Sequence, residues 1–302
     1  MRTPAAAAAI LPALLMAGCL LGRMESPAIT VWATGDSAQV SPAAPIETRN
    51  RHWRSSPPAL LLAGGRNEWL GAQIILSSPR AVSPVAVEIG DLSSETGAIG
   101  RENARLFLEV YVPVKTATDR SGSTGPGDYP DPLVPFFDPY TRSRREIASP
   151  LSLPRGRNVP VWIDLYIPPE TPPGIYRGEI TITVRGRTAK AIAVELEVWN
   201  FTLPARRTLP VFFDLYAYRF ARGEGVPFAL SDASWEVLKN YEIMAHEHGF
   251  VNGHWGIMPG GAGKEGKVDW TDYDRRFGPV LDGSLFADRA PPACWELPFP
   301  EG

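Results

Sequence analysis

The segment "NVPVWIDLYIPPETPPGIYRGEITITV", residues 158–184, shows the pattern that best indicates the fold class. In its first half, apolar side chains recur at every second position from Val161 to Ile167. In the second half, the apolar residues Ile180, Ile182 and Val184 alternate with polar residues in the same way. Because successive side chains of a strand point to opposite faces, this period of two predicts a pair of half-buried antiparallel strands. The prolines of residues 168–174 predict a stiff corner between them.

The same alternation extends to both sides of this stretch. "ARLFLEVYVPV" at 104–114 and "AIAVELEVW" at 191–199 alternate, and "RGR" at 185–187 predicts a hairpin turn. Several short strands separated by tight turns are typical of an antiparallel, all-β sandwich, which we place at residues 28–205. Residues 116–147 lack this periodicity and predict one long loop that packs on a neighbour or has a function of its own.

The pattern changes after the sandwich, and residues 208–302 predict an incomplete α/β domain. "LPVFFDLYAY" at 209–218 is a continuous apolar run, as expected of a parallel strand buried on both faces. A helix is predicted to follow, with a buried stripe through Val237, Tyr241, Met244 and His248.

Further along, a second strand, a shorter helix and a third strand in "PPACWELPF" predict a unit resembling the first three βα repeats of a TIM-type barrel. A complete barrel needs about 250 residues, and residues 208–302 number 95, so we expect a truncated or partial barrel.

The N-terminus predicts export. Arg2 precedes an apolar run too short to span a membrane comfortably, and the run ends in "LMAGC". Residues 1–19 are therefore read as a signal peptide with a lipobox, in which Cys19 is acylated, or as a plain signal peptide cleaved nearby. The only other cysteine is Cys294, so an internal disulfide is excluded from the mature protein.

Composition and histidine spacing argue against nucleic acid and metal as partners. The formal net charge of −3, from 30 basic and 33 acidic residues, gives no reason to expect nucleic acid. Three of the four histidines lie between 246 and 254, but His246 and His248 are two residues apart. Because one helix presents two metal ligands at a spacing of four, structural roles are the simpler interpretation. We expect no metal and no cofactor.

Strings along most of the chain resemble one family. They are "RNEWLGAQIIL" (66–76), "ARLFLEVYVPV", "GDYPDPLVPFFDP" (127–139), the opening stretch, "VELEVWNFTLP" (194–204), "DYDRRFGPVLDGSLF" (272–286) and "CWELPFPEG" (294–302). Together they resemble glycoside hydrolase family 123-like proteins, from about Ile29 to the last residue. The first five strings correspond to the sandwich of that family and the last two to the opening of its barrel.

The resemblance implies an exported bacterial protein, either a cell-envelope lipoprotein or secreted, that acts on glycans. The family's complete enzymes remove β-linked N-acetylgalactosamine by substrate-assisted retaining hydrolysis, for which an adjacent Asp-Glu pair is needed. The chain contains no Asp-Glu dipeptide. We therefore assign no catalytic residue and expect the chain by itself to be inactive.

Four residues are candidates for contacts with a glycan. His254, Trp255, Glu301 and Asp214 fall at or near strand ends, where barrel active sites gather, with plain packing as the alternative. A glycan is the predicted partner, together with a membrane reached through the lipid anchor at Cys19. The competing hypothesis is a non-catalytic glycan-binding or scaffold lipoprotein that uses the aromatic side chains of "DYPDPLVPFFDPY".

Overall fold

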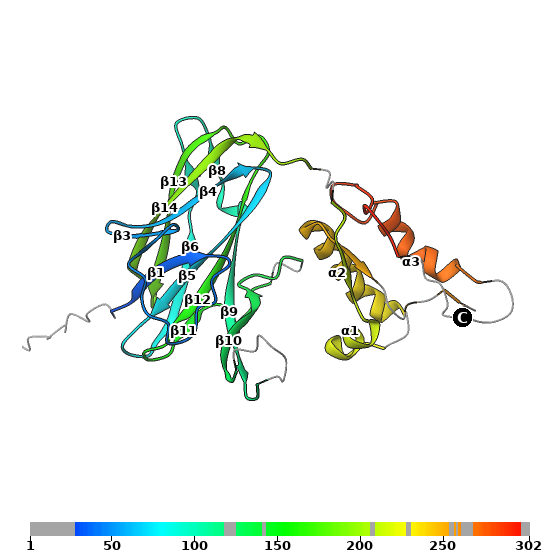
Figure 1. The fold of residues 1–302 in the computed structure, drawn as a ribbon, viewed down its shortest axis with the longest axis horizontal. Helices are drawn as coiled ribbons and strands as arrows, with labels where there is room; N and C mark the ends of the chain where they lie inside the picture. Colours follow the sequence, from blue (N-terminus) through cyan, green and yellow to red (C-terminus); the bar gives the residue numbers. More distant parts are fainter. Residues whose placement is uncertain are drawn as a thin grey trace, which may run out of the picture.

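A computed structural model describes residues 28–117, 125–140, 143–205, 209–227, 231–253, 257, 259–260 and 268–296. Figure 1 shows a sandwich of strands followed by a smaller, mainly helical unit. Two hydrophobic clusters correspond to these parts, one drawn from residues between Ile29 and Val198 and the other from residues between Phe220 and Phe286.

Two sheets build the sandwich. The five-stranded sheet has the order β1 (Thr30–Gly35), β5 (Glu68–Ser77), β12 (Val159–Ile167), β9 (Ala104–Val114), β10 (Gly127–Pro135). The nine-stranded sheet has the order β11 (Leu151–Leu153), β6 (Val82–Ile89), β13 (Gly174–Val184), β14 (Arg187–Thr202), β4 (Pro58–Arg66), β3 (Trp53–Ser55), β2 (Arg49–Asn50), with β7 (Leu92–Ser93) and β8 (Ala98–Ile99) at its side. A short 3-10 turn, η1 (Arg101–Asn103), leads into β9.

The sandwich core follows from the alternation in the sequence. Along β12, Val161, Ile163, Leu165 and Ile167 are buried, whereas Trp162, Asp164 and Tyr166 are only partly buried on the opposite face. Burying one face of each sheet removes a large apolar area from water, and each Å² of that area stabilises the fold by roughly 25 cal/mol. The prediction of a β-sandwich is confirmed.

Both predicted connectors are present. The turn after β13 places Arg185 at φ 51° and Gly186 at φ 75°, the positive pair that joins twisted antiparallel strands in two residues. In the proline-rich corner, the Tyr176 hydroxyl donates to the Pro172 carbonyl at 2.8 Å. One pairing departs from the antiparallel expectation, because β14 lies parallel to β4. These two strands are distant in sequence, so no hairpin fixes their relative direction.

The predicted long loop at 116–147 contains a strand. β10 pairs antiparallel with β9, with a register shift between Pro130 and Leu133. Prolines at 130, 132 and 135 hid this strand from the period-of-two test. A proline cannot donate to a neighbouring strand, but β10 is the edge of its sheet, where one side needs no donor.

In its described residues, the C-terminal unit contains two strands and three helices. They are β15 (Phe212–Asp214), α1 (Ala217–Glu224), α2 (Asp232–His248), β16 (Val251–Gly253) and α3 (Thr271–Leu281). β15 and β16 pair in parallel. Ser231 caps α2 through a reciprocal capping box with Ser234, and Gly249 ends it at φ 78°.

Three expectations for this unit need correction. Only Phe212–Asp214 of the run 209–218 is a strand, and all three residues are exposed, since no described element covers them on both faces. Residues 291–296, the described part of the predicted third strand, are irregular. Met244 and His248 are exposed, because the face that α2 buries runs through Ser234, Leu238, Glu242 and Ala245 instead.

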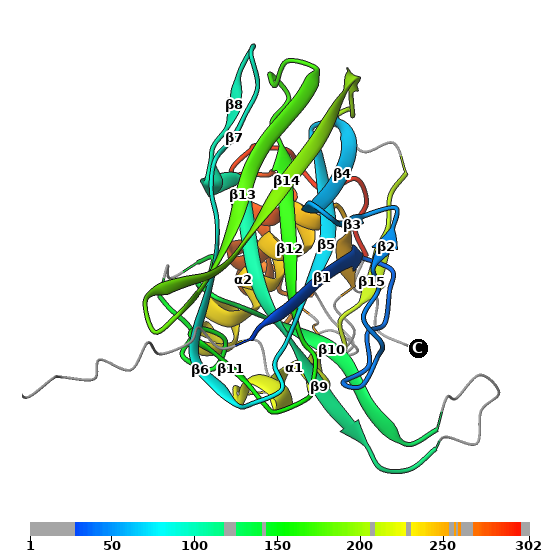
Figure 2. The same cartoon turned by 90° about the vertical axis from the view of Figure 1, so that its left-hand side faces the viewer.

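The helical unit lies on one side of the sandwich. In Figure 1, α2 faces the sheet that holds β9 and β12. Figure 2 shows the opposite side, with β13, β14 and β4 toward the viewer and the helices behind the sandwich. The outer face of the five-stranded sheet therefore adjoins the C-terminal unit, and the outer face of the nine-stranded sheet points away from it.

Candidate functional site at the outer face of the five-stranded sheet

Of the residues selected from the sequence as glycan contacts, only Asp214 can be placed. Its carboxylate is exposed at the end of β15, and Asp214 pairs in register with Gly253 on β16. His254, Trp255 and Glu301 lie outside the described residues, as does Cys19, so their roles stay predictions.

His246 has a structural environment. Its Nε2 atom lies 2.9 Å from Oδ1 of Asp288, and its ring stacks on Phe286 with centroids 3.7 Å apart. His248, two residues on, is exposed. The two histidines of the helix end therefore do not converge. In the described part of the chain, no group of three or more His, Cys, Asp or Glu side chains is placed to hold a metal ion.

The outer face of the five-stranded sheet brings together aromatic and charged side chains. Trp69 on β5 pairs in register with Tyr166 on β12, and their ring centroids are 5.0 Å apart. Arg105 on β9 pairs with Asp164, and its guanidinium lies 4.7 Å from the centroid of a Trp69 ring. We call Trp69, Arg105, Asp164 and Tyr166 the junction cluster.

Among the described residues, an ion pair joins the junction cluster to the C-terminal unit. Arg105 Nη1 lies 3.6 Å from Oε2 of Glu247, in the last turn of α2. Arg105 is thus held by an aromatic ring on the sandwich while its charge faces a helix of the other unit. An exposed ion pair alone is worth about 0–1 kcal/mol, so its role is orientation rather than stability.

Burial raises the pKa of two groups at this junction. Burial raises the pKa of Asp164, and the hydrogen bond from Trp162 Nε1, at 2.7 Å, with the charges of His248 and Arg105, opposes that rise. Burial also raises the pKa of Tyr140, with Glu247 acting in the same direction and Arg105 against it. Charges on α2 therefore affect the pKa values of groups on the sandwich.

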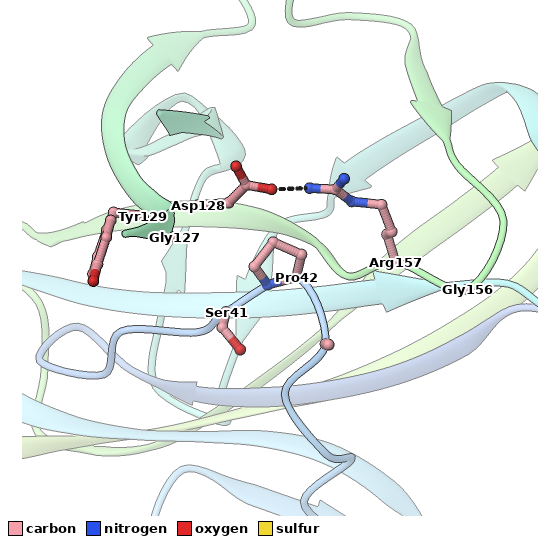
Figure 3. Close-up of a pocket in the computed structure, with 8 residues that line it drawn as sticks. Ser41, Pro42, Gly127, Asp128, Tyr129, Gly156 and Arg157 are labelled. Atoms are coloured by element: carbon pink, nitrogen blue, oxygen red, sulfur yellow. Dashed lines mark hydrogen bonds and ion pairs between the residues drawn. The ribbon is translucent and has the colours of Figure 1, made fainter. Parts of the chain in front are cut away.

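A shallow depression lies elsewhere on the sandwich. Its volume is about 480 Å³, and it is lined by Ser41, Pro42, Ala43, Gly127, Asp128, Tyr129, Gly156 and Arg157. Figure 3 shows Asp128 and Arg157 turned toward one another beside Pro42, and their ion pair measures 2.7 Å. Because these two charges neutralise each other, the depression is a weaker candidate for a binding site than the junction.

Glu109 on β9 is a buried carboxyl. Glu109 is only 7% exposed, and its Oε2 atom has no hydrogen-bond partner in the described part of the chain. Burial raises the pKa of Glu109 from 4.5 to about 7. Tyr111, two residues further on, donates its hydroxyl to the Val40 carbonyl at 3.0 Å. The segment after β1 therefore packs against this end of β9.

Sequence reasoning missed the junction cluster, although part of its signal was visible. The alternation in β12 already placed Trp162, Asp164 and Tyr166 on the face opposite the core. What the sequence lacked was the register that sets Tyr166 against Trp69 and Asp164 against Arg105. Register between strands distant in sequence depends on tertiary pairing, which no local pattern specifies.

The fold defines a two-layer β-sandwich protein with an appended α/β unit, and comparison with known proteins shows which proteins it is similar to. The sequence model of the glycoside hydrolase 123 N-terminal domain matches residues 49–184. These residues run from β2 to the end of β13. Over these residues the chain is therefore similar to glycoside hydrolase 123 proteins. No curated protein sequence matches it.

One solved structure supports the same fold. A family 123 glycoside hydrolase from Clostridium perfringens, described for glycolipid glycan hydrolysis, matches with a TM-score of 0.53 and 17% identity. The match covers 64% of this chain and 32% of that one, so the chain spans about a third of that structure's length. The N-terminal domain of PorA matches over 57% of this chain and 99% of its own, with 8% identity and a TM-score of only 0.25.

Proposed function

We propose that the chain is the N-terminal part of an exported glycoside hydrolase that releases β-linked N-acetylgalactosamine from glycans. The observation that carries this proposal is the match of residues 49–184 to the glycoside hydrolase 123 N-terminal domain. The Clostridium perfringens enzyme, whose fold the chain shares, is described as acting on glycolipid glycans. A glycolipid glycan is accordingly the substrate class that we propose.

In this proposal the sandwich, residues 28–205, supports an α/β domain that begins at residue 208 and belongs to a TIM-type barrel. The parallel pairing of β15 with β16 agrees with the start of such a barrel. The junction cluster positions this domain, because Arg105 is anchored on Trp69 and reaches Glu247 of α2. A small rotation of the α/β domain relative to the sandwich would displace every strand end that carries a substrate contact.

The chemistry needs a carboxylic acid for the leaving oxygen and a carboxylate that orients the 2-acetamido group. The 302 residues contain no adjacent Asp-Glu pair to supply them. We propose that these residues position substrate-binding elements and do not themselves break the glycosidic bond. Asp214, His254, Trp255 and Glu301 remain the proposed sugar contacts.

Export and anchoring complete the proposal. The apolar run before Cys19 would direct the chain to the cell envelope, where acylation of Cys19 would tether it. No helix in the described ranges is long and apolar enough to cross a bilayer. Radiolabelled palmitate should enter the protein expressed with its leader and should not enter a Cys19→Ala variant. Equal labelling of both would contradict the lipid anchor and leave the plain signal peptide.

The proposed division of labour is tested with the purified chain. Incubated with p-nitrophenyl N-acetyl-β-galactosaminide, the 302-residue chain should release no p-nitrophenol above a buffer control. Release that persists through repeated purification would mean that these residues contain the acid and the orienting carboxylate. The proposed supporting role would then be wrong, whatever the substrate of the complete protein.

A further inference from the structure

Two exposed aromatic rings lie side by side near the end of β14. Trp199 and Phe201 are 42% and 47% exposed, and their rings are stacked, with centroids 5.8 Å apart and an angle of 28° between the planes. The pairing of β14 with β4 is irregular between Val198 and Thr202, but both rings are exposed, whereas Val198 before them is buried, so both lie on the outer face of the nine-stranded sheet. We call this pair the aromatic strip.

The strip is seated on a glycine. A Cβ atom added to Gly65 of the neighbouring strand β4 would lie 2.5 Å from Cε2 and 2.9 Å from Cζ of Phe201. No side chain fits there, so the Phe201 ring lies directly against the β4 backbone and turns its other face outward. A ring held in this way loses little conformational freedom when a ligand covers it.

Hydrogen bonds hold the strand end that carries the strip. The Leu203 amide donates to the Arg66 carbonyl at 2.9 Å, and Asn67 Nδ2 donates to the Leu203 carbonyl at 3.0 Å. Asn67 itself occupies the left-handed turn between β4 and β5, at φ 59°. The end of β14 is therefore tied to a hairpin of the sandwich, which makes the strip a fixed surface.

Polar and apolar groups border the strip on the same face. Glu197, two residues before Trp199, is exposed and pairs in register with Ile175, which is also exposed. One step further, Glu195 forms an ion pair with Arg54 of β3. A carboxylate acceptor therefore stands next to a flat apolar surface about two rings long.

The described helices of the C-terminal unit lie on the other side of the molecule. Figures 1 and 2 place the helices beyond the five-stranded sheet, with β13, β14 and β4 on the opposite side of the sandwich. The aromatic strip is thus separate from the junction cluster and takes no part in the contact between the two units.

We propose that the aromatic strip binds an extended β-linked oligosaccharide. The face of an aromatic ring carries the negative part of its quadrupole, which attracts the slightly positive C–H groups on the apolar face of a pyranose. Two neighbouring rings match two successive sugar units, and Glu197 can accept hydrogen bonds from their hydroxyl groups. A stable protein interface would instead bury roughly 800 Å² on each partner, far more than two side chains offer.

The proposal shares with the proposed function only the expectation that the protein meets glycans. Its readout is binding by this chain, not hydrolysis, so either proposal can fail alone. The experiment is a titration of the chain with β-linked hexasaccharides of glucose, N-acetylglucosamine, xylose, mannose and galactose. Binding is followed by calorimetry and tryptophan fluorescence, with far-UV circular dichroism as the check that each variant is folded.

At least one hexasaccharide should bind saturably, and Trp199→Ala or Phe201→Ala should weaken that binding by about ten-fold or more. Gly65→Val should weaken it as well, because the new side chain displaces the Phe201 ring while both aromatic residues remain. Trp270→Ala is the matched control, since Trp270 is 40% exposed but lies at the start of α3 in the C-terminal unit, and it should bind like the wild type.

Three results would overturn the proposal. One is the absence of saturable binding to every hexasaccharide at millimolar concentration. Another is binding that Trp69→Ala abolishes and Trp199→Ala leaves intact, which would place the site on the junction cluster. The third is a wild-type dimer in light scattering that Trp199→Ala converts to a monomer, which would make a second copy of the chain the occupant of the strip.

Discussion

Replacing Glu109 by glutamine should change how the stability of the protein depends on pH. Glutamine keeps the shape of the side chain and removes its titration. Burial raises the pKa of Glu109 from 4.5 to about 7 in the folded protein. Between these two values the folded state holds a proton that the unfolded state has released. The free energy of unfolding of the wild type should therefore fall as pH rises through this window.

The size of the effect follows from the shift. A difference of about 2.5 units between 4.5 and about 7, at about 1.4 kcal/mol per unit, corresponds to roughly 3 kcal/mol. Local relaxation around the charged form lowers this value, so we expect the stability difference to be about 1–3 kcal/mol. Below pH 4.5 both states are protonated and this contribution to stability is complete, whereas above pH 7 it is lost.

The assay is urea unfolding followed by tryptophan fluorescence at a series of pH values from 5 to 8. The stability of Glu109→Gln minus that of the wild type should increase from pH 5 to about pH 7 and then level off toward pH 8. Glu88→Gln is the matched control, because Glu88 is an exposed carboxylate on β6. Its difference from the wild type should stay within about 0.5 kcal/mol at every pH. A Glu109→Gln difference that is flat with pH would refute the buried-carboxyl argument.

Three further predictions test the core, a helix cap and the junction. Ile163→Ala removes a fully buried side chain of β12 and should cost about 2–5 kcal/mol in urea unfolding; a loss below about 1 kcal/mol would mean that the two sheets are not packed there. Ser231→Ala removes the capping box of α2, and should cost about 1 kcal/mol with faster amide exchange in the first turn of that helix, whereas exchange raised evenly along the chain would contradict a local cap. Arg105→Glu places two negative charges at the contact with Glu247 and should enlarge the radius of gyration in small-angle scattering. The free energy of unfolding of the sandwich should stay within about 0.5 kcal/mol of the wild type. An unchanged scattering profile would show that this contact does not orient the C-terminal unit.

The strands that alternate most regularly could be predicted from the sequence. Residues 158–184 form β12 and β13, joined at the proline-rich corner, because their apolar period of two matches a surface buried on one side only. The hairpin at Arg185 and Gly186 was predictable for a local reason as well. Its two residues adopt positive φ angles, a conformation that glycine favours.

Elements whose form depends on tertiary position could not be predicted. β10 carries prolines that a strand tolerates only at the edge of a sheet, and the sequence does not say which strand is the edge. The run 209–218 is apolar throughout, which indicates burial on both faces, yet its strand has three residues and is exposed. On α2, the stripe through Met244 and His248 lies one position away from the face that packs inward.

The candidate site was only partly visible in the sequence. Asp214 was selected for its place at a strand end, and the structure leaves its carboxylate exposed there. The junction cluster and the aromatic strip needed the pairing of strands that are far apart in the chain. Gly65 illustrates this, because its lack of a side chain has meaning only once β4 is known to lie beside β14, under the Phe201 ring.

The most direct test of the account is a hydrolysis assay on the native protein, isolated from its source with an antibody against the sandwich. Incubated with a glycolipid oligosaccharide that ends in β-linked N-acetylgalactosamine, it should release the free monosaccharide with retention of the anomeric configuration. Release should stop when a thiazoline analogue of the substrate-assisted intermediate is added. Native protein that is pure and folded, but releases no sugar from any such glycan, would contradict the proposal that this sandwich belongs to a glycoside hydrolase.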